Sequence, residues 1–263
     1  MDFYRFESIF NNYCHYFTKF ADQSDPNLKL KKEHSLRVAH EAWRLAQNEK
    51  FSARLIYLTR LAGLFHDIGR FEQYIRFKTF RDSDSVDHAR LGFKILTRQG
   101  LLDSLSIMDS RCVRLAVLFH SKMVIPSGLP ADISLTARAL RDADKLDIFP
   151  VLISHLAPGV ANNSVVTLGL EQSEKITPEI FDQVSSGRLG EYSRMRYLND
   201  FKLLICSWAY DLNFSHSRRM VLHRRYIQAV FSLLPKRTEL KELQDRILDH
   251  LRNGSYLKTT GTR

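Results

Sequence analysis

Histidine and aspartate residues spread along the chain in a fixed order are its best candidates for chemistry. In a sequence of 263 residues, the order is His34, His66, Asp67, His88, His120 and Asp144. Neutral imidazole and carboxylate groups together suit divalent ions of the Mn, Fe, Ni, Zn and Mg group. The three cysteines are far apart and form no metal-ligand pair. The set therefore predicts a metal-dependent enzyme that holds one or two divalent ions.

The chemistry that such a set would run most simply is hydrolysis of a phosphate ester or anhydride. Two divalent ions about 3.5–4 Å apart can stabilise both the attacking and the leaving oxygen of a phosphoryl group, and a metal lowers the pKa of bound water to about 7. Arg70, Lys122 and Lys145 follow the ligand candidates closely along the chain. Because arginine and lysine both bind phosphate, these three are the candidate contacts for a substrate phosphate.

The elements that must position these residues are predicted to be helices. Apolar residues at helical spacing predict helices over residues 2–20, 28–48, 52–65, 85–99, 104–121 and 133–156. His34 lies within the second of these segments. Gly69 follows the His-Asp doublet at the place where a helix would end. We expect residues 70–84 to form a loop with at most a short helical turn, and Pro150 to interrupt the last helix.

The C-terminal third differs from the rest in charge. The chain carries a net charge of +10, and residues 188–263 account for +8 of it, with 15 Lys/Arg against 7 Asp/Glu. Further helices are predicted over residues 191–212, 216–234 and 238–251. We therefore predict a metal-binding helical core over 1–157, an irregular connection or lid over 158–190, and a basic helical lobe over 191–263 packed on the core. Such a lobe fits an anionic ligand or partner, or a solvated face.

The ordered residues resemble the motif of the HD-domain superfamily, helical metalloenzymes named for their His-Asp doublet. The family pattern H…HD…D is matched by His34, His66, Asp67 and Asp144. Asp144 is assigned from the Ala-Asp-Lys-Leu block at 143–146, with Asp142 and Asp147 as competing assignments. The resemblance covers roughly residues 34–150. It implies an all-α fold, a helical bundle of the HD type, here with a C-terminal helical extension.

Two further histidines extend the resemblance to HD branches that bind two metals. His88 and His120 stand where those branches add ligands, and the resemblance implies that Asp67 bridges the two ions and acts with His66 in catalysis. No Gly-Tyr-Pro sequence follows His120, and Ser121 replaces the second histidine of a His-His pair. These departures argue against a true HD-GYP cyclic-dinucleotide phosphodiesterase.

The resemblance implies a metal-dependent phosphohydrolase or phosphodiesterase acting on a small phosphorylated metabolite, with a nucleotide as the expected class. One alternative is an HD-type oxygenase, because such proteins hold two irons with the same kind of ligand set. Another is a non-catalytic nucleic-acid-binding or signalling module, which the lack of any recognisable binding motif disfavours. No stretch reaches the roughly 18 apolar residues of a membrane span, and the acidic start is unlike a signal peptide. We expect a cytoplasmic protein, with its oligomeric state open.

Overall fold

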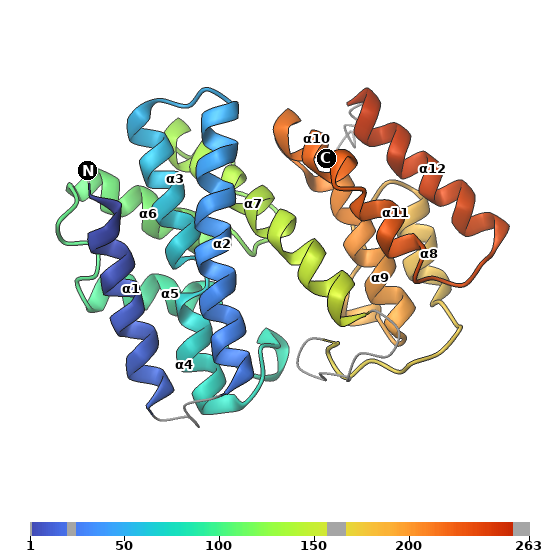
Figure 1. The fold of residues 1–263 in the computed structure, drawn as a ribbon, viewed down its shortest axis with the longest axis horizontal. Coiled ribbons are helices and arrows are strands. Elements are labelled where there is room, and N and C mark those ends of the chain that lie inside the picture. Colours follow the sequence, from blue (N-terminus) through green and yellow to red (C-terminus); the bar gives the residue numbers. More distant parts are fainter. Residues whose placement is uncertain (1, 20–24, 157–166, 255–263) are drawn as a thin grey trace. The chain divides into compact units, whose positions relative to one another are not determined.

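The computed structural model describes residues 2–19, 25–156 and 167–254, and over these residues the chain is helical with a single isolated β-bridge (Figure 1). The predicted all-α fold is confirmed. The chain divides into two compact units, residues 1–148 and 149–263. Within the described residues, no helix is both long and apolar enough to cross a membrane.

The first unit is a bundle of helices packed against one another. Its elements are α1 (Phe3–Thr18), α2 (Pro26–Asn48), α3 (Ala53–Phe65), α4 (Ile68–Phe77), η1 (Asp82–Asp84), α5 (His88–Arg98), α6 (Ile107–Phe119) and the greater part of α7 (Ala131–His155). Helix α2 packs on α3, α4 on α5, and α6 on both α3 and α5. Helices α1, α2 and α4 contact one another and run side by side in Figure 1.

Aromatic packing fixes the end of α3, where the His-Asp doublet follows. Phe65 is fully buried and meets Phe10 of α1 edge to face, with ring centroids 5.9 Å apart. Phe10 also meets Phe71 of α4 at 6.1 Å. Burying one such ring contributes about 1.5–3 kcal/mol, and edge-to-face contact adds about 0.5–1.5 kcal/mol. The turn between α3 and α4 is therefore held by the core on both sides.

The second unit consists of shorter helices around an aromatic core. Its elements are the end of α7, α8 (Pro178–Ser185), η2 (Tyr192–Arg194), α9 (Leu198–Ser207), η3 (Trp208–Asp211), α10 (Ser215–His223), α11 (Tyr226–Phe231) and α12 (Thr238–Asn253). Phe149 stacks on Tyr226, with ring centroids 5.1 Å apart, and meets Trp208 edge to face at 5.7 Å. The isolated bridge pairs Glu171 with Tyr197.

Three predictions from the sequence were wrong, each for a physical reason. Residues 70–84 are not mainly a loop, because α4 occupies 68–77 and buries Phe71 and Tyr74. Gly69 does not end a helix but lies in the first turn of α4. Pro150 does not interrupt α7, since a proline removes only one backbone hydrogen bond and residues on both sides of it are buried.

The structure corrects two of the predictions for the C-terminal part of the chain and leaves the others open. The segment predicted as one helix over 216–234 is two helices, because Arg225 adopts a left-handed backbone with φ of 54°. Part of the segment expected to be irregular, 178–185, is helix α8. Residues 157–166 of the predicted connection or lid, and the tail from 255, lie outside the described residues. The proposed boundaries at 157 and 190 stay predictions.

Candidate metal centre

Four histidine side chains in the first unit meet in two pairs. His34 lies within α2 and His66 directly follows α3, and their Nε2 atoms are 3.1 Å apart. His88 begins α5 and His120 directly follows α6, and their Nε2 atoms are 3.2 Å apart. All four side chains are buried. Within each pair one ring comes from the body or start of a helix and the other from the end of a second helix.

The Nδ1 atom of every ring faces a hydrogen-bond acceptor. His66 Nδ1 lies 2.8 Å from the Gly63 carbonyl oxygen, and His120 Nδ1 lies 2.6 Å from that of Val117. His34 Nδ1 and His88 Nδ1 each lie 2.7 Å from a carboxylate oxygen, of Asp147 and Asp82 respectively. Since carbonyl and carboxylate oxygens only accept, each Nδ1 carries the proton. A ring that carries its proton on Nδ1 can offer an Nε2 lone pair, and the Nε2 atoms face each other within both pairs.

The carboxylate of Asp67 lies between the two pairs and turns one oxygen toward each. Its Oδ2 is 3.7 Å from His34 Nε2 and 3.6 Å from His66 Nε2. Its Oδ1 is 3.4 Å from His88 Nε2 and 3.9 Å from His120 Nε2. The side chain is only 3% exposed. This placement is that of a carboxylate able to bridge two ions.

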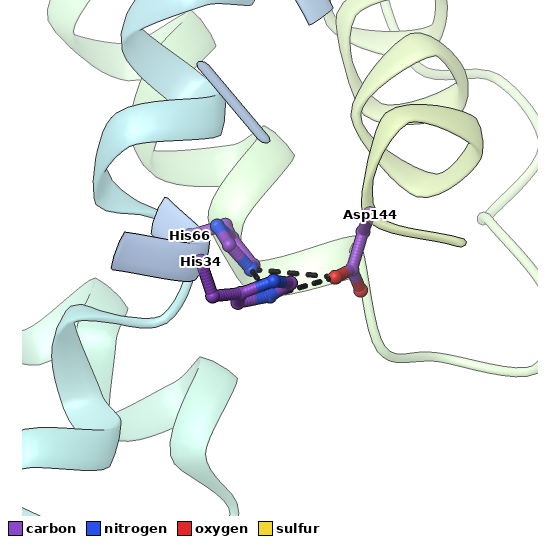
Figure 2. Close-up of side chains that lie close together, drawn as sticks. All are labelled: His34, His66 and Asp144. Carbon is purple, nitrogen blue, oxygen red and sulfur yellow. Dashed lines mark hydrogen bonds and ion pairs between the residues drawn. The ribbon is translucent and has the colours of Figure 1, made fainter. Parts of the chain in front are cut away.

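Asp144 of α7 completes the first pair. Its Oδ1 lies 3.1 Å from His34 Nε2 and 3.5 Å from His66 Nε2 (Figure 2). This oxygen is buried, and among the described residues it has no hydrogen-bond donor beyond these two rings. Of the two competing aspartates, Asp147 lies on the far side of the His34 ring, at Nδ1. Asp142 is fully buried and is absent from the groups of described side chains close enough to share an ion.

Two glycines let the helices approach closely enough to bring these rings together. A Cβ at Gly63 of α3 would lie 2.8 Å from the Cα of Ala39 in α2. A Cβ at Gly69 of α4 would lie 2.2 Å from the backbone oxygen of His88 and 2.8 Å from the backbone nitrogen of Gly92 in α5. Both contacts are with backbone, so no larger residue fits without moving a helix. Gly69 thus holds the Asp67 turn against the start of α5.

The donor atoms fit divalent ions by spacing and by type. Ligands at about 2.1 Å from one ion, and about 90–110° apart, are separated by roughly 3.0–3.4 Å. The two Nε2–Nε2 distances, 3.1 and 3.2 Å, fall in this range. Facing lone pairs beside carboxylate oxygens repel one another unless a cation lies among them. The nitrogen and oxygen donors suit borderline or hard divalent metals, and the residues present fit one or two such ions.

The protonation states favour ligation by most of these groups. Burial raises the pKa of Asp67, but Lys31 and the neighbouring imidazoles outweigh burial and hold that pKa well below its usual range. Burial, with His88 nearby, lowers the pKa of His120 to about 3. Burial alone would lower the pKa of His66, but Asp67 and Asp144 reverse this and raise it. A metal must therefore displace a proton from His66 at low pH.

The three cations predicted to bind phosphate have different surroundings. Arg70 Nη1 donates to Asp82 Oδ1 at 2.7 Å and to the Phe80 carbonyl at 2.5 Å, while its Nε lies 3.5 Å from Asp67 Oδ1. Lys122 Nζ pairs with Asp87 at 2.5 Å and is partly exposed. Lys145 is partly buried in α7. Their roles toward a substrate stay predictions.

The sequence did not predict Lys31, Arg37 or Asp82 at the centre, and it offered Asp147 only as an alternative ligand to Asp144. Lys31 Nζ lies 2.6 Å from Asp67 Oδ2. Asp147 and Asp82 accept from the ligand histidines, and Arg37 donates twice to Asp147, at 2.7 and 3.0 Å. A one-turn spacing from His34 places both Lys31 and Arg37 near its ring, and this spacing was the signal that could have found them. No pattern marks Asp82, which reaches His88 through the turn after α4.

Comparison with known proteins agrees with this geometry. A family model described as HD domain matches residues 32–148, which include all six candidate ligands. No curated protein and no solved structure matched the chain.

Proposed function

Residues 32–148 match the HD-domain family, and from this match we propose that the protein is a metal-dependent phosphohydrolase. Its proposed substrate is a phosphate ester or anhydride of a small phosphorylated metabolite, with a nucleotide as the expected class. The observation that carries the proposal is the position of Asp67, with one oxygen facing each of two histidine pairs. Such a set would hold one or two divalent ions beside Asp67.

The proposed ligand assignment follows from these distances. His34, His66, Asp144 and Asp67 Oδ2 would hold one ion. His88, His120 and Asp67 Oδ1 would hold the second, with fewer protein donors and so more room for water and substrate. When bound, paired divalent ions lower the pKa of water and polarise a phosphoryl oxygen.

Other side chains would orient the ligands, exclude water and place positive charge near the substrate. Asp147 and Asp82 keep the Nδ1 proton on His34 and His88 and so aim each Nε2 inward. Burial of all four rings keeps bulk water from competing for their lone pairs. Lys31, only 18% exposed in its side chain, places a positive charge at Asp67 and within reach of an anionic substrate. Lys122 and Lys145 are the further proposed phosphate contacts.

Metal analysis and a substrate screen test the proposal together. Purified protein should contain a divalent metal, and phosphorylated metabolites with Mn²⁺, Mg²⁺, Ni²⁺ or Fe²⁺ should release phosphate without oxygen. Activity that requires both iron and O₂ would favour the oxygenase alternative instead. His34→Gln should abolish phosphate release and lower metal content. His40→Gln, an exposed histidine on the same helix, is the matched control and should retain both.

A further inference from the structure

A second cluster of chemically active side chains lies in the second unit, away from the residues of the metal centre in the sequence. A hollow of about 320 Å³ is lined by three basic side chains, Lys175, Arg196 and Arg237. Tyr197, Ile176, Thr177 and the first two residues of α8, Pro178 and Glu179, complete its wall. We refer to this cavity as the basic hollow. Two of the basic residues of the C-terminal third, Arg196 and Arg237, thus line one concave site together with Lys175.

The three cations of the basic hollow outnumber the acids beside it, which are Glu179 on the wall and the buried Asp200 behind it. Within the described parts of the chain, none of them forms an ion pair, and Glu179 is the one acidic residue on the wall. Arg237 Nη2 donates to the Glu174 carbonyl at 2.8 Å, and Lys175 Nζ lies 5.9 Å from the centre of the Tyr197 ring. Like charges around one cavity repel each other, and a bound anion would turn this repulsion into attraction.

A buried carboxylate holds the walls of the basic hollow in place. Asp200 is fully buried and accepts from the Thr177 backbone at 2.7 Å and from the Thr177 hydroxyl at 2.6 Å. It also accepts from the backbone nitrogens of Arg196 and Tyr197, both at 2.9 Å. One side chain therefore ties the start of α8 to the segment that carries Arg196. The backbone of these two wall segments is therefore held in place before a ligand arrives, which lowers the entropic cost of binding.

A second set of contacts fixes the remaining wall. Asn199 Nδ2 donates to the Ser173 carbonyl at 2.7 Å and to the Lys175 carbonyl at 3.3 Å, so the backbone at Lys175 is held in place. The segment around Glu171 pairs with that around Tyr197, with Leu198 N donating to the Glu171 carbonyl at 2.9 Å. The positive end of α8 faces the same cavity and adds to its attraction for anions.

We propose that the basic hollow is a binding site for a small anion bearing one or two phosphate groups, such as pyrophosphate or a small phosphorylated metabolite. Ligand pockets usually measure about 300–1,000 Å³, and 320 Å³ lies at the small end. Arginine offers paired donors to phosphate oxygens, and lysine adds a point charge. This site uses none of the metal ligands and does not depend on the proposed phosphohydrolase activity.

Calorimetric titration of the full chain with inorganic pyrophosphate tests this proposal. The protein is first freed of metal with chelator and dialysed, so that the metal centre contributes no ion-mediated binding. We expect saturable binding of one pyrophosphate per chain. Arg196→Gln and Arg237→Gln should each weaken it about tenfold or more, since each removes a charged donor. Arg196→Lys should restore part of the affinity. Both arginines are exposed, and circular dichroism checks that the fold is kept.

Two control variants distinguish binding in the basic hollow from binding at the metal centre and from general charge attraction. Asp67→Asn alters the metal centre and should leave pyrophosphate binding unchanged. Arg252→Gln removes the same charge from an exposed pair with Asp249 on α12 and should also have no effect. The proposal is overturned if the wild-type protein shows no saturable binding at millimolar pyrophosphate, if the Arg196 and Arg237 variants bind as the wild type does, or if either control loses binding. Binding of a single-stranded oligonucleotide without pyrophosphate binding would also overturn it.

Discussion

Gly69→Ala adds a single methyl group at the contact that positions the candidate centre. The new Cβ would lie 2.2 Å from the backbone oxygen of His88 and 2.8 Å from the backbone nitrogen of Gly92. Backbone atoms cannot rotate away as a side chain can. To reach even 3.0 Å from the oxygen, α4 and α5 must separate by about 0.8 Å. Asp67 precedes α4 and His88 begins α5, so their 3.4 Å contact must open as well.

The size of the effect follows from two opposing contributions. Overpacking of a close contact costs about 1–3 kcal/mol, and a backbone collision belongs at the upper end of that range. Alanine is favoured over glycine in a helix by about 1 kcal/mol. We therefore expect Gly69→Ala to lower the free energy of unfolding by about 2 kcal/mol. A misplacement of about 1 Å costs roughly 100-fold in turnover, so activity should fall further than stability does.

Gly92→Ala is the matched control, because it lies in the same interface. A Cβ there would meet side-chain atoms, Ile68 Cγ2 at 3.3 Å and Val117 Cγ1 at 3.4 Å, which can shift slightly. Urea unfolding, calorimetric metal binding and turnover should all stay near wild type for this variant. If Gly69→Ala keeps the wild-type unfolding midpoint and metal affinity, or if Gly92→Ala is equally damaging, the α4–α5 contact does not position the centre.

Three further predictions concern the candidate ligands and their partners. Asp67→Ala should abolish activity and lower metal content by elemental analysis while circular dichroism stays helical; full turnover would contradict the bridging role. Asp147→Asn and Asp82→Asn should each lower the affinity for one ion by about 10–100-fold, and calorimetry that finds both affinities unchanged would argue against these hydrogen bonds. Metal binding should depend on pH in two ways. Because the pKa of His66 is raised, a proton competes with the ion below that pKa, and the affinity of the first pair should rise with pH until His66 is neutral. His120, with a pKa lowered to about 3, is already neutral, so affinity at the second pair should stay flat from about pH 5 upward; equal pH profiles at the two pairs would refute this difference.

The sequence predicted the all-α fold because helical spacing of apolar residues is a local property. It also predicted which histidines and aspartates meet, but through a family pattern of residue order and not through packing. The helix α4 was missed because Gly69 and a polar stretch hide a short amphipathic pattern, in which Phe71 and Tyr74 face the core. A glycine that permits close approach cannot be told from one that ends a helix until its neighbour in space is known.

Among the residues that contact the ligands, only Lys31 and Arg37, about one helical turn from His34, carried a spacing signal. Asp82 had no sequence signal and Asp147 only that of an alternative ligand to Asp144, because their acceptance of an imidazole proton depends on how a turn and a distant helix pack. Lys31 looks like a solvated residue in a basic run, yet its ammonium group lies 2.6 Å from the bridging carboxylate. The charge count of the C-terminal third did not show that Arg196 and Arg237 would line one hollow with Lys175.

The acceptors at the four Nδ1 atoms limit how many ligand rings a single substitution outside the ligand set can disturb. In each pair, one imidazole is oriented by a carboxylate that a single substitution can remove. The other is oriented by a main-chain oxygen, of Gly63 or Val117, within its own helical end. Replacing Asp147 or Asp82 can therefore disorient one histidine of its pair but not the other. Substitutions at Asp82 and Asp147 should therefore reduce metal binding partially, whereas substitutions of the ligands should abolish it.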